Sequence, residues 1–235
     1  MKFYESGDSS KPVIFLFPGT CCLYSSFEHV LDGLHSYFYT VTVSYDGFDP
    51  NEKTEFYSME DECEKIEQEI KKKYCGRIKA AYGCSLGGSL VSLLIQRKRI
   101  HIEHGIIGSS DMDEAGKLVA KIQASMVVPF MYKMAHTGDL PKYMQKKLSK
   151  SDVAKKELYN GFLNMFGIGK GGSPWITKQS IYNQFYSDLV TKVQHGIDVP
   201  GTTIHVFYAT KMGKKYEKRY CTCLLYTSPS PRDRT

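Results

Sequence analysis

The sequence GCSLGG at residues 83–88 constrains the fold more than any other stretch. It lies between a β-like run at 78–82 and an apolar run from Leu86 to Ile95. A strand, a sharp turn and a helix form the context in which a G-x-S-x-G pattern becomes informative. Glycines two residues before and after Ser85 let the strand and the helix approach closely, while the turn lifts the serine hydroxyl above the sheet. The segment therefore predicts a strand–turn–helix unit that presents Ser85 as a nucleophile, and a plain glycine-rich turn is the alternative.

Apolar runs and helical periodicities alternate on both sides of this motif. A cap at Ser25 or Ser26, a capping box of Ser58 and Asp61, and the turn at Ser85 each predict the start of a helix. Continuous apolar or β-branched runs predict strands at residues 13–17, 39–45, 78–82, 101–108 and 202–209. This alternation predicts the α/β class, with a mostly parallel sheet flanked by helices and with reactive groups at the carboxyl ends of the strands.

Between Lys117 and Pro174 the alternation stops. This stretch is helical in character and contains an apolar segment at 126–132 and a basic run at 142–150. An insertion of this length between strands is expected to form a helical cap over a pocket at the strand ends. A membrane-touching surface is the alternative, because Met and Phe stand beside Lys. The predicted organisation is one domain over residues 1–222 with a cap at about 117–174.

The composition of the chain limits which partners, such as nucleic acids or membranes, it is expected to bind. The chain has 235 residues and a formal net charge of +6, but its basic residues are interspersed with acids, which argues against nucleic-acid binding. No apolar stretch of bilayer length and no secretory leader pattern is seen, so we expect no stable membrane insertion. Seven scattered cysteines favour reduced thiols and a cytoplasmic location. We expect no cofactor, because the glycines at 169–172 lack phosphate-loop spacing, and no metal site; the oligomeric state is left open.

The order of elements and the turn at Ser85 resemble the α/β-hydrolase fold, over a range from about residue 13 to residue 220. The resemblance implies that Ser85 is the nucleophile and that the N–H groups of Leu86 and of Gly19 or Thr20 form the oxyanion hole. Family members commonly carry His-Gly in the second loop, whereas this chain has Pro18 before Gly19, so the backbone donor is kept and the side chain differs.

The same resemblance implies an activity. The expected function is hydrolysis of an acyl bond in a small-molecule substrate, a carboxylic ester in first place, through a serine nucleophile. A non-catalytic member of the fold that uses the same cleft for binding is the alternative. An enzyme based on Cys84 or Cys21 is weaker, because neither thiol has a visible base partner.

In this family the acid and then the histidine follow the serine along the chain. Asp111, just past the strand at 101–108, is the candidate acid, with Asp113 as its near neighbour, and either could instead cap the next helix. No histidine follows His205, which lies within a strand, and His195 precedes it. We therefore expect the general base in a missing C-terminal segment, which would leave these residues nearly inert.

The last residues differ in character from the rest. The segment CLLYTSPSPRD at 223–233 resembles a translated sequencing adapter, so residues 223–235 are expected to be a non-native tail and the native sequence to run to about Thr222. A natural disordered Ser/Pro tail is the alternative. On the first interpretation, the cysteines at 221 and 223 are not metal ligands.

Overall fold

In a computed structural model, six strands pair into one sheet in the order β1-β3-β2-β4-β5-β6. The structure describes residues 1–110, 114–138, 146, 172–193 and 197–207, so the tail at 223–235 lies outside the described residues. The strands are β1 (Lys2–Ser6), β2 (Val13–Phe17), β3 (Tyr39–Ser44), β4 (Arg77–Cys84), β5 (His101–Gly108) and β6 (Thr203–Phe207). Every neighbouring pair is parallel except β1 and β3, which confirms the predicted α/β class and mostly parallel sheet.

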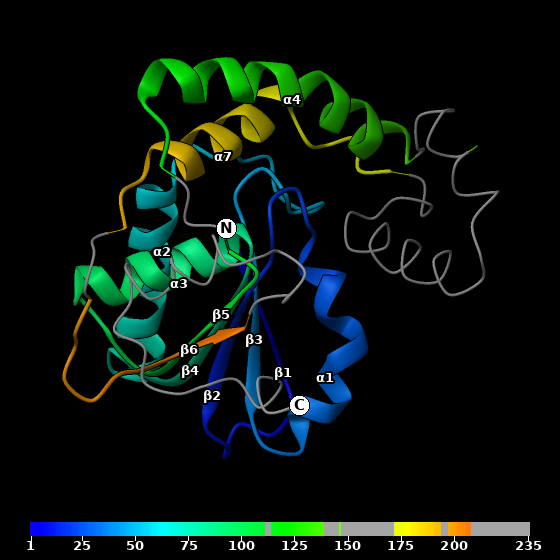
Figure 1. Ribbon diagram of the computed structural model, residues 1–235. Helices are drawn as coiled ribbons and strands as arrows, with labels where there is room; N and C mark the ends of the chain where they lie inside the picture. The colour runs from blue at the N-terminus through cyan, green and yellow to red at the C-terminus, as the bar shows by residue number, and fades with distance from the viewer. Residues whose placement is uncertain (111–113, 139–145, 147–171, 194–196, 208–235) are drawn as a thin grey trace.

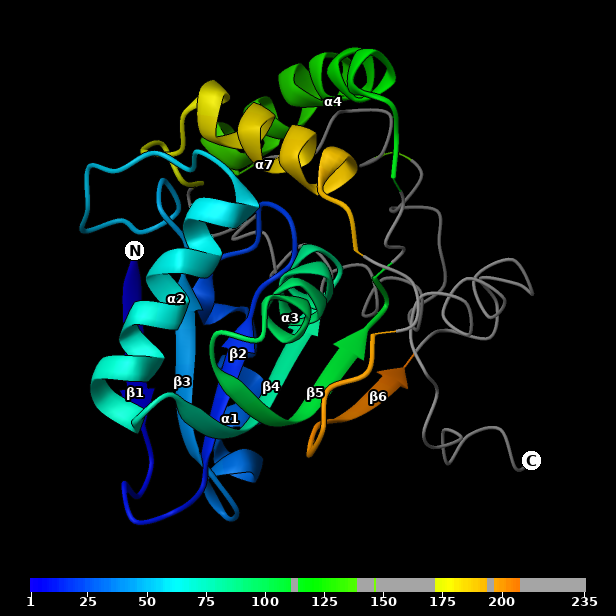
Figure 2. The ribbon, with the colours of Figure 1, turned by 90° about the vertical axis from the view of Figure 1, so that its left-hand side faces the viewer.

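Helices cover both faces of this sheet (Figures 1 and 2). The helices are α1 (Glu28–His35), preceded by the 3-10 turn η1 (Tyr24–Phe27), α2 (Met59–Tyr74), α3 (Leu86–Arg97), α4 (Lys117–Thr137) and α7 (Lys178–Val190). The helices α2 and α3 pack on one face and α1 lies on the other. In β2, the side chains of Phe15 and Phe17 join the larger core, while Ile14 and Leu16 face α1. This explains why β2 is a continuous apolar run, since a strand covered on both faces has no solvent side.

The predicted start of α2 is confirmed, and that of α1 is wrong. The Ser58 hydroxyl oxygen accepts a hydrogen bond from Asp61 N at 3.1 Å, as the capping box requires. By contrast, α1 begins at Glu28 without any side-chain cap. Ser25 and Ser26 lie inside η1 instead, because Ser26 N donates to a carbonyl three residues back and tightens the chain before the α-helix starts.

The edge strand β1 is not among the predicted strands. Its sequence, KFYES, has no continuous apolar run, and its residues are mostly half-buried. It exists because it pairs antiparallel with β3, with Phe3 opposite Val43 in the register. The ring of Phe3 also packs edge-on against Phe15, with 6.2 Å between the ring centroids. Tertiary pairing, rather than local pattern, therefore forms this strand.

The helices α4 and α7 lie together beyond the carboxyl ends of the strands (Figure 2). Two contacts fix α7 over the loops there: Phe56 N donates to Ser180 Oγ at 3.2 Å, and Ala115 N donates to Leu189 O at 2.8 Å. Within the described residues, no helix is long and apolar enough to cross a bilayer.

Glu62 in α2 is a buried carboxyl group that needs an explanation. Its side chain is fully buried, Asp46 N donates to its Oε2 at 3.2 Å, and Lys65 Nζ lies 3.5 Å from its Oε1. Burial, followed by the negative charge of Asp46, raises the pKa of Glu62 to about 8. The folded protein therefore keeps Glu62 protonated at pH values where an unfolded chain would release that proton.

This pKa shift predicts a pH-dependent loss of stability. In the unfolded chain, Glu62 ionises near the ordinary glutamate pKa. The stabilisation that its protonated form gives the folded state is therefore complete below that pKa, and it is lost as pH rises toward 8. We expect Glu62→Gln to flatten the fall in unfolding free energy between about pH 5 and pH 8, by up to ~1.4 kcal/mol per pH unit. Urea denaturation at several pH values measures this. Glu60→Gln, on the exposed side of α2, is the control, and equal slopes in both variants would contradict the assignment.

Candidate functional site

The turn at Ser85 joins β4 directly to α3. Ser85 has φ 53° and ψ −120°, a conformation that a residue with a side chain adopts only when its surroundings hold it there. Its N–H donates to Gly108 O at 2.8 Å, and its carbonyl accepts from Gly88 N at 2.8 Å and from Ser89 N at 3.2 Å. The side chain is exposed at the carboxyl end of the sheet. The predicted sharp turn is therefore present, with its serine at the surface.

Three glycines allow this turn to form. A Cβ on Gly83 would collide with the backbone of Gly87, and a Cβ on Gly87 would collide with the carbonyls of Phe17 and Pro18. A Cβ on Gly88 would lie 2.8 Å from Ser110 Cβ. The start of α3 thus packs directly against the ends of β2 and β4, which only glycine permits.

The loop after β2 lies beside the serine. A Cβ built on Gly19 would be 3.6 Å from Ser85 Cβ and 3.3 Å from the carbonyl oxygen of Cys84. The loop closes as a tight turn, with Cys22 N donating to Gly19 O at 3.0 Å. The structure therefore brings Gly19, which Thr20 follows in the chain, next to Ser85 and Leu86, although the two pairs lie in separate segments of the sequence.

Three of these residues have backbone donors without a protein partner among the described residues. Within the described residues, the N–H groups of Gly19, Thr20 and Leu86 donate to no protein acceptor. Leu86 is the first residue of α3, where N–H groups lack helical partners and the helix dipole favours negative charge. The site can therefore offer hydrogen bonds to an oxyanion beside the Ser85 hydroxyl.

Two residues that sequence reasoning missed hold this loop in place. Cys21 N donates to Gln184 Oε1 at 2.7 Å, and the Tyr45 hydroxyl donates to Pro18 O at 2.9 Å; all the atoms are buried. Gln184 comes from α7, far along the chain, and no local pattern signals such a contact. Tyr45 is the last residue of the predicted strand at 39–45, so its position at the carboxyl end of the sheet could be predicted. Its hydrogen bond to Pro18 could not.

The acid and the base are not part of the described site. Asp111 and Asp113 lie outside the described residues, as does His195. Among the histidines that the structure describes, none hydrogen-bonds Ser85. His205 in β6 has its Nε2 3.2 Å from Nδ1 of His104 in β5, which gives it a partner within the sheet.

The thiols near Ser85 are poor candidates for a nucleophile. Burial raises the pKa of the Cys84 thiol and, together with the neighbouring Cys84, raises that of Cys22 to about 12. The pKa of the buried Cys21 thiol is also raised, first by desolvation and then by Cys22. A thiol that stays protonated is a weak nucleophile, which disfavours a cysteine-based site. Among the residues that the structure describes, no three potential metal-ligating side chains gather.

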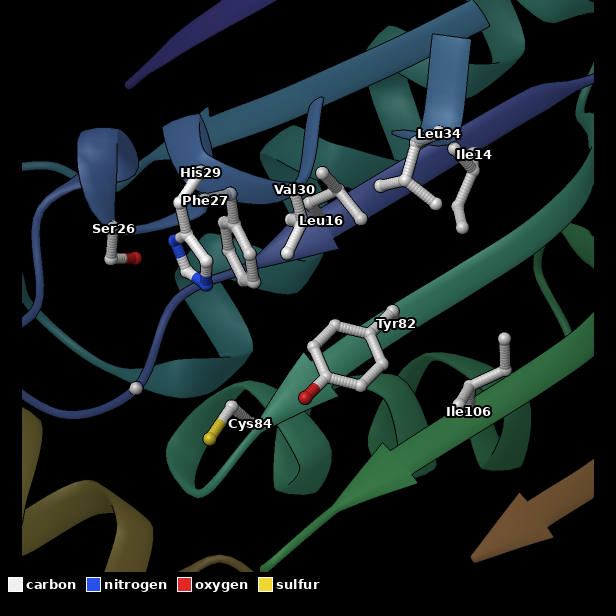
Figure 3. A pocket seen from close by; sticks show the side chains of 11 residues that line it. Ile14, Leu16, Ser26, Phe27, His29, Val30, Leu34, Tyr82, Cys84 and Ile106 are labelled. Atoms are coloured by element: carbon white, nitrogen blue, oxygen red, sulfur yellow. The ribbon is translucent and has the colours of Figure 1, made fainter. Parts of the chain in front are cut away.

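A cavity of about 370 Å³ opens on the α1 side of the sheet, next to the turn (Figure 3). Gly19 and Cys84 line its end nearest the serine, and Tyr82 and His29 supply most of its remaining polar atoms. The other walls come from β2, β5, α1 and the 3-10 turn η1, and they are apolar except for Ser26. An apolar cavity with a few polar groups is the usual form of a small-molecule site.

Comparison with solved structures identifies the fold. An α/β-hydrolase family protein from Desulfitobacterium hafniense is 14% identical, with a TM-score of 0.66 over 88% of this chain and 79% of that one. A carboxylesterase from the thaumarchaeon Nitrososphaera gargenis is 12% identical, with a TM-score of 0.62 over 97% and 86%. MenH from S. aureus is 12% identical, with a TM-score of 0.60 over 94% and 98%.

Sequence comparison adds nothing to this: no family model and no curated protein matches the chain. The structural matches show that it has the α/β-hydrolase fold, as the resemblance implied.

The glycine contacts predict opposite effects for two alanine substitutions. Gly87→Ala should destabilise the protein by about 2 kcal/mol or more, because the new Cβ meets backbone that cannot move aside. Gly33→Ala in α1 is the matched control, since a Cβ there meets nothing within 4 Å. It should stabilise by about 0.5–1 kcal/mol through the helix propensity of alanine. Thermal and urea unfolding measure both, and a Gly87→Ala variant as stable as the parent would refute the packing argument.

Proposed function

We propose that this chain is a serine hydrolase acting on an acyl bond, a carboxylic ester in first place, with Ser85 as the nucleophile. The observation that carries the proposal is the conformation of Ser85, exposed at positive φ beside unpaired N–H donors. Strained backbone at an exposed nucleophile is a feature of functional sites. The hydrolases among the structural neighbours, one of them a carboxylesterase, favour the same reaction class.

In the proposed reaction, Ser85 Oγ attacks the acyl carbonyl carbon and forms a tetrahedral intermediate. The carbonyl oxygen takes the negative charge and accepts hydrogen bonds from Leu86 N and from Gly19 or Thr20 N. The bond to the alcohol then breaks, which leaves an ester on Ser85, and a water molecule attacks that ester to release the acid. Removing oxyanion donors of this kind typically costs about 10²–10³ in rate.

The proposal assigns the remaining groups outside the described residues. Asp111 is the proposed acid, with Asp113 as the alternative. The base that takes the Ser85 proton is a histidine that none of the described residues provides. Removing a base of this kind costs most of the rate that a complete triad gives, so turnover is expected to depend on that histidine.

We further propose that residues 117–174 form a cap that shapes the substrate site. The position of α4 and α7 beyond the carboxyl ends of the strands supports this (Figure 2). A further support lies just past this range: α4 packs on α7, and Gln184 of α7 binds the loop beside Ser85. The substrate is then a small molecule held between the cap and the sheet. Five described cysteines are free thiols, which fits the proposed cytoplasmic location.

One observation favours a second candidate, a binding protein without catalysis. The apolar cavity beside the turn could hold a ligand whether or not Ser85 reacts. A binding protein would leave Ser85 unmodified by acyl donors, so the same experiment separates the two functions.

The test is acylation of Ser85 by p-nitrophenyl acetate, followed by peptide mapping. We expect an acetyl group on Ser85, because p-nitrophenolate is a good leaving group and lowers the need for a general base during acylation. Ser109 is an internal control, since it is also exposed at a strand end with positive φ and should stay unmodified. Ser85→Ala should remove the adduct and any ester turnover. Equal labelling of both serines, or none at Ser85, would reject the nucleophile assignment.

A further inference from the structure

The helix α4 carries two apolar faces, and only one of them is buried. Its small residues Ala120 and Ala124 are fully buried, where the helix packs on α7. Val128 and Met134 are buried as well, but three larger side chains point outward: Leu118, Ile122 and Met126 are 72%, 52% and 74% exposed. A soluble helix usually places its apolar stripe toward the core and polar residues opposite, so this arrangement is unusual.

The outward side chains form one continuous surface, which we call the α4 outer face. At 100° per residue, positions from Leu118 to Phe130 that are four apart cover an arc of about 120°. The α4 outer face consists of Leu118, Val119, Ile122, Met126 and Phe130, all exposed. Figure 1 shows α4 as the outermost layer, with α7 between it and the body of the molecule. Among the described residues, no other element packs on this face.

The charges on α4 are all of one sign. Its 21 residues include Lys117, Lys121 and Lys133, all exposed, and no aspartate or glutamate. None of the three lysines forms an ion pair within the described residues. Glu114, just before the helix, is paired with Lys192 at 3.0 Å and so is already engaged. At 100° per residue, Lys133 lies in line with the α4 outer face and Lys121 lies nearer to its border than Lys117 does. An apolar face with lysines near it and no acid complements a surface that is both apolar and negatively charged.

We propose that the α4 outer face docks on an anionic phospholipid surface, with the helix lying in the plane of the interface. Leu118, Ile122 and Met126 would enter the boundary between headgroups and acyl chains, while the lysines meet lipid phosphates. The attachment is peripheral, because no described helix can span a bilayer. It goes beyond the proposed hydrolase function and does not depend on Ser85.

A second copy of this chain fits the same face less well. A two-fold dimer brings identical surfaces together, so α4 would meet α4. Lysines from both copies would then crowd one interface with no acid on either helix to neutralise them, and like charges at close range are destabilising. A lipid surface instead supplies the missing negative charges.

The experiment is vesicle flotation with the 235-residue chain. Vesicles of phosphatidylglycerol and phosphatidylcholine are compared with vesicles of phosphatidylcholine alone, at low and at high salt. We expect binding to be roughly tenfold or more stronger on the anionic vesicles at low salt, and weaker at high salt because exposed charges are screened. Absence of binding to the anionic vesicles would overturn the proposal.

Paired variants show whether α4 is the surface that binds. Met126→Glu and Lys121→Glu should each weaken binding several-fold. Their controls are Tyr37→Glu, at a residue 72% exposed beyond α1, and Lys72→Glu, at an exposed lysine of α2; both should bind like the parent chain. Equal losses in Lys121→Glu and Lys72→Glu would mean that net charge alone attracts the protein, which contradicts the proposal.

Circular dichroism and light scattering complete the test. All four substituted side chains are exposed, so we expect unchanged spectra and monomers of equal mass. A dimer of the parent chain that Met126→Glu dissociates would assign the α4 outer face to a second copy and overturn the lipid proposal.

Discussion

The close contact between the start of α3 and the ends of β2 and β4 is the constraint on which the site depends. The backbone conformation of Ser85, at φ 53°, costs ~1–3 kcal/mol relative to a relaxed backbone. Burial of α3 offsets this, since the residues from Leu86 to Ile95 are all buried. The bonds of Ser85 to Gly108 and Gly88 then leave the turn no freedom to relax. A backbone held in this way keeps the helix N-terminus and the β2 loop in a fixed relation, which makes their N–H groups usable together.

The sequence predicted those parts of the fold that local physics decides. Buried parallel strands such as β2 and β4 can be recognised from the sequence, because strands covered on both faces are mostly apolar runs. The cap at Ser58 can be recognised because its hydrogen bond lies within one helical turn. The strand β1 and the start of α1 could not be predicted in this way, because their local sequence patterns do not specify them. Phe3 becomes part of a strand only through β3, and Ser26 lies in a 3-10 turn, which its sequence pattern does not distinguish from a helix cap.

In the candidate site, too, the parts set by local sequence could be predicted and the long-range contacts could not. The placement of Ser85, Leu86 and Gly19 at the strand ends was predictable from glycine spacing, while their catalytic roles stay predictions. The supports of the loop at Gly19 were not predictable, because Gln184 reaches Cys21 from α7 across most of the chain. Buried polar contacts between distant segments produce no periodic sequence pattern that would predict them. Such contacts nevertheless hold the backbone of a site in position. The acid, expected at Asp111 or Asp113, lies outside the described residues and stays a prediction.

The packing of α4 on α7 leaves several large apolar side chains of the helix exposed, although Val128 and Met134 are buried. Ala120 and Ala124 let α4 approach α7 closely, but alanine side chains contribute little apolar area, and stabilisation follows area at about 25 cal/mol per Å². Turning Leu118, Ile122 and Met126 inward would bury more surface, so folding alone does not account for their position. A face of this kind either meets another surface or exposes the protein to aggregation. The lysines of α4 limit the second outcome by mutual repulsion between molecules, and they do so without preventing contact with a surface of opposite charge.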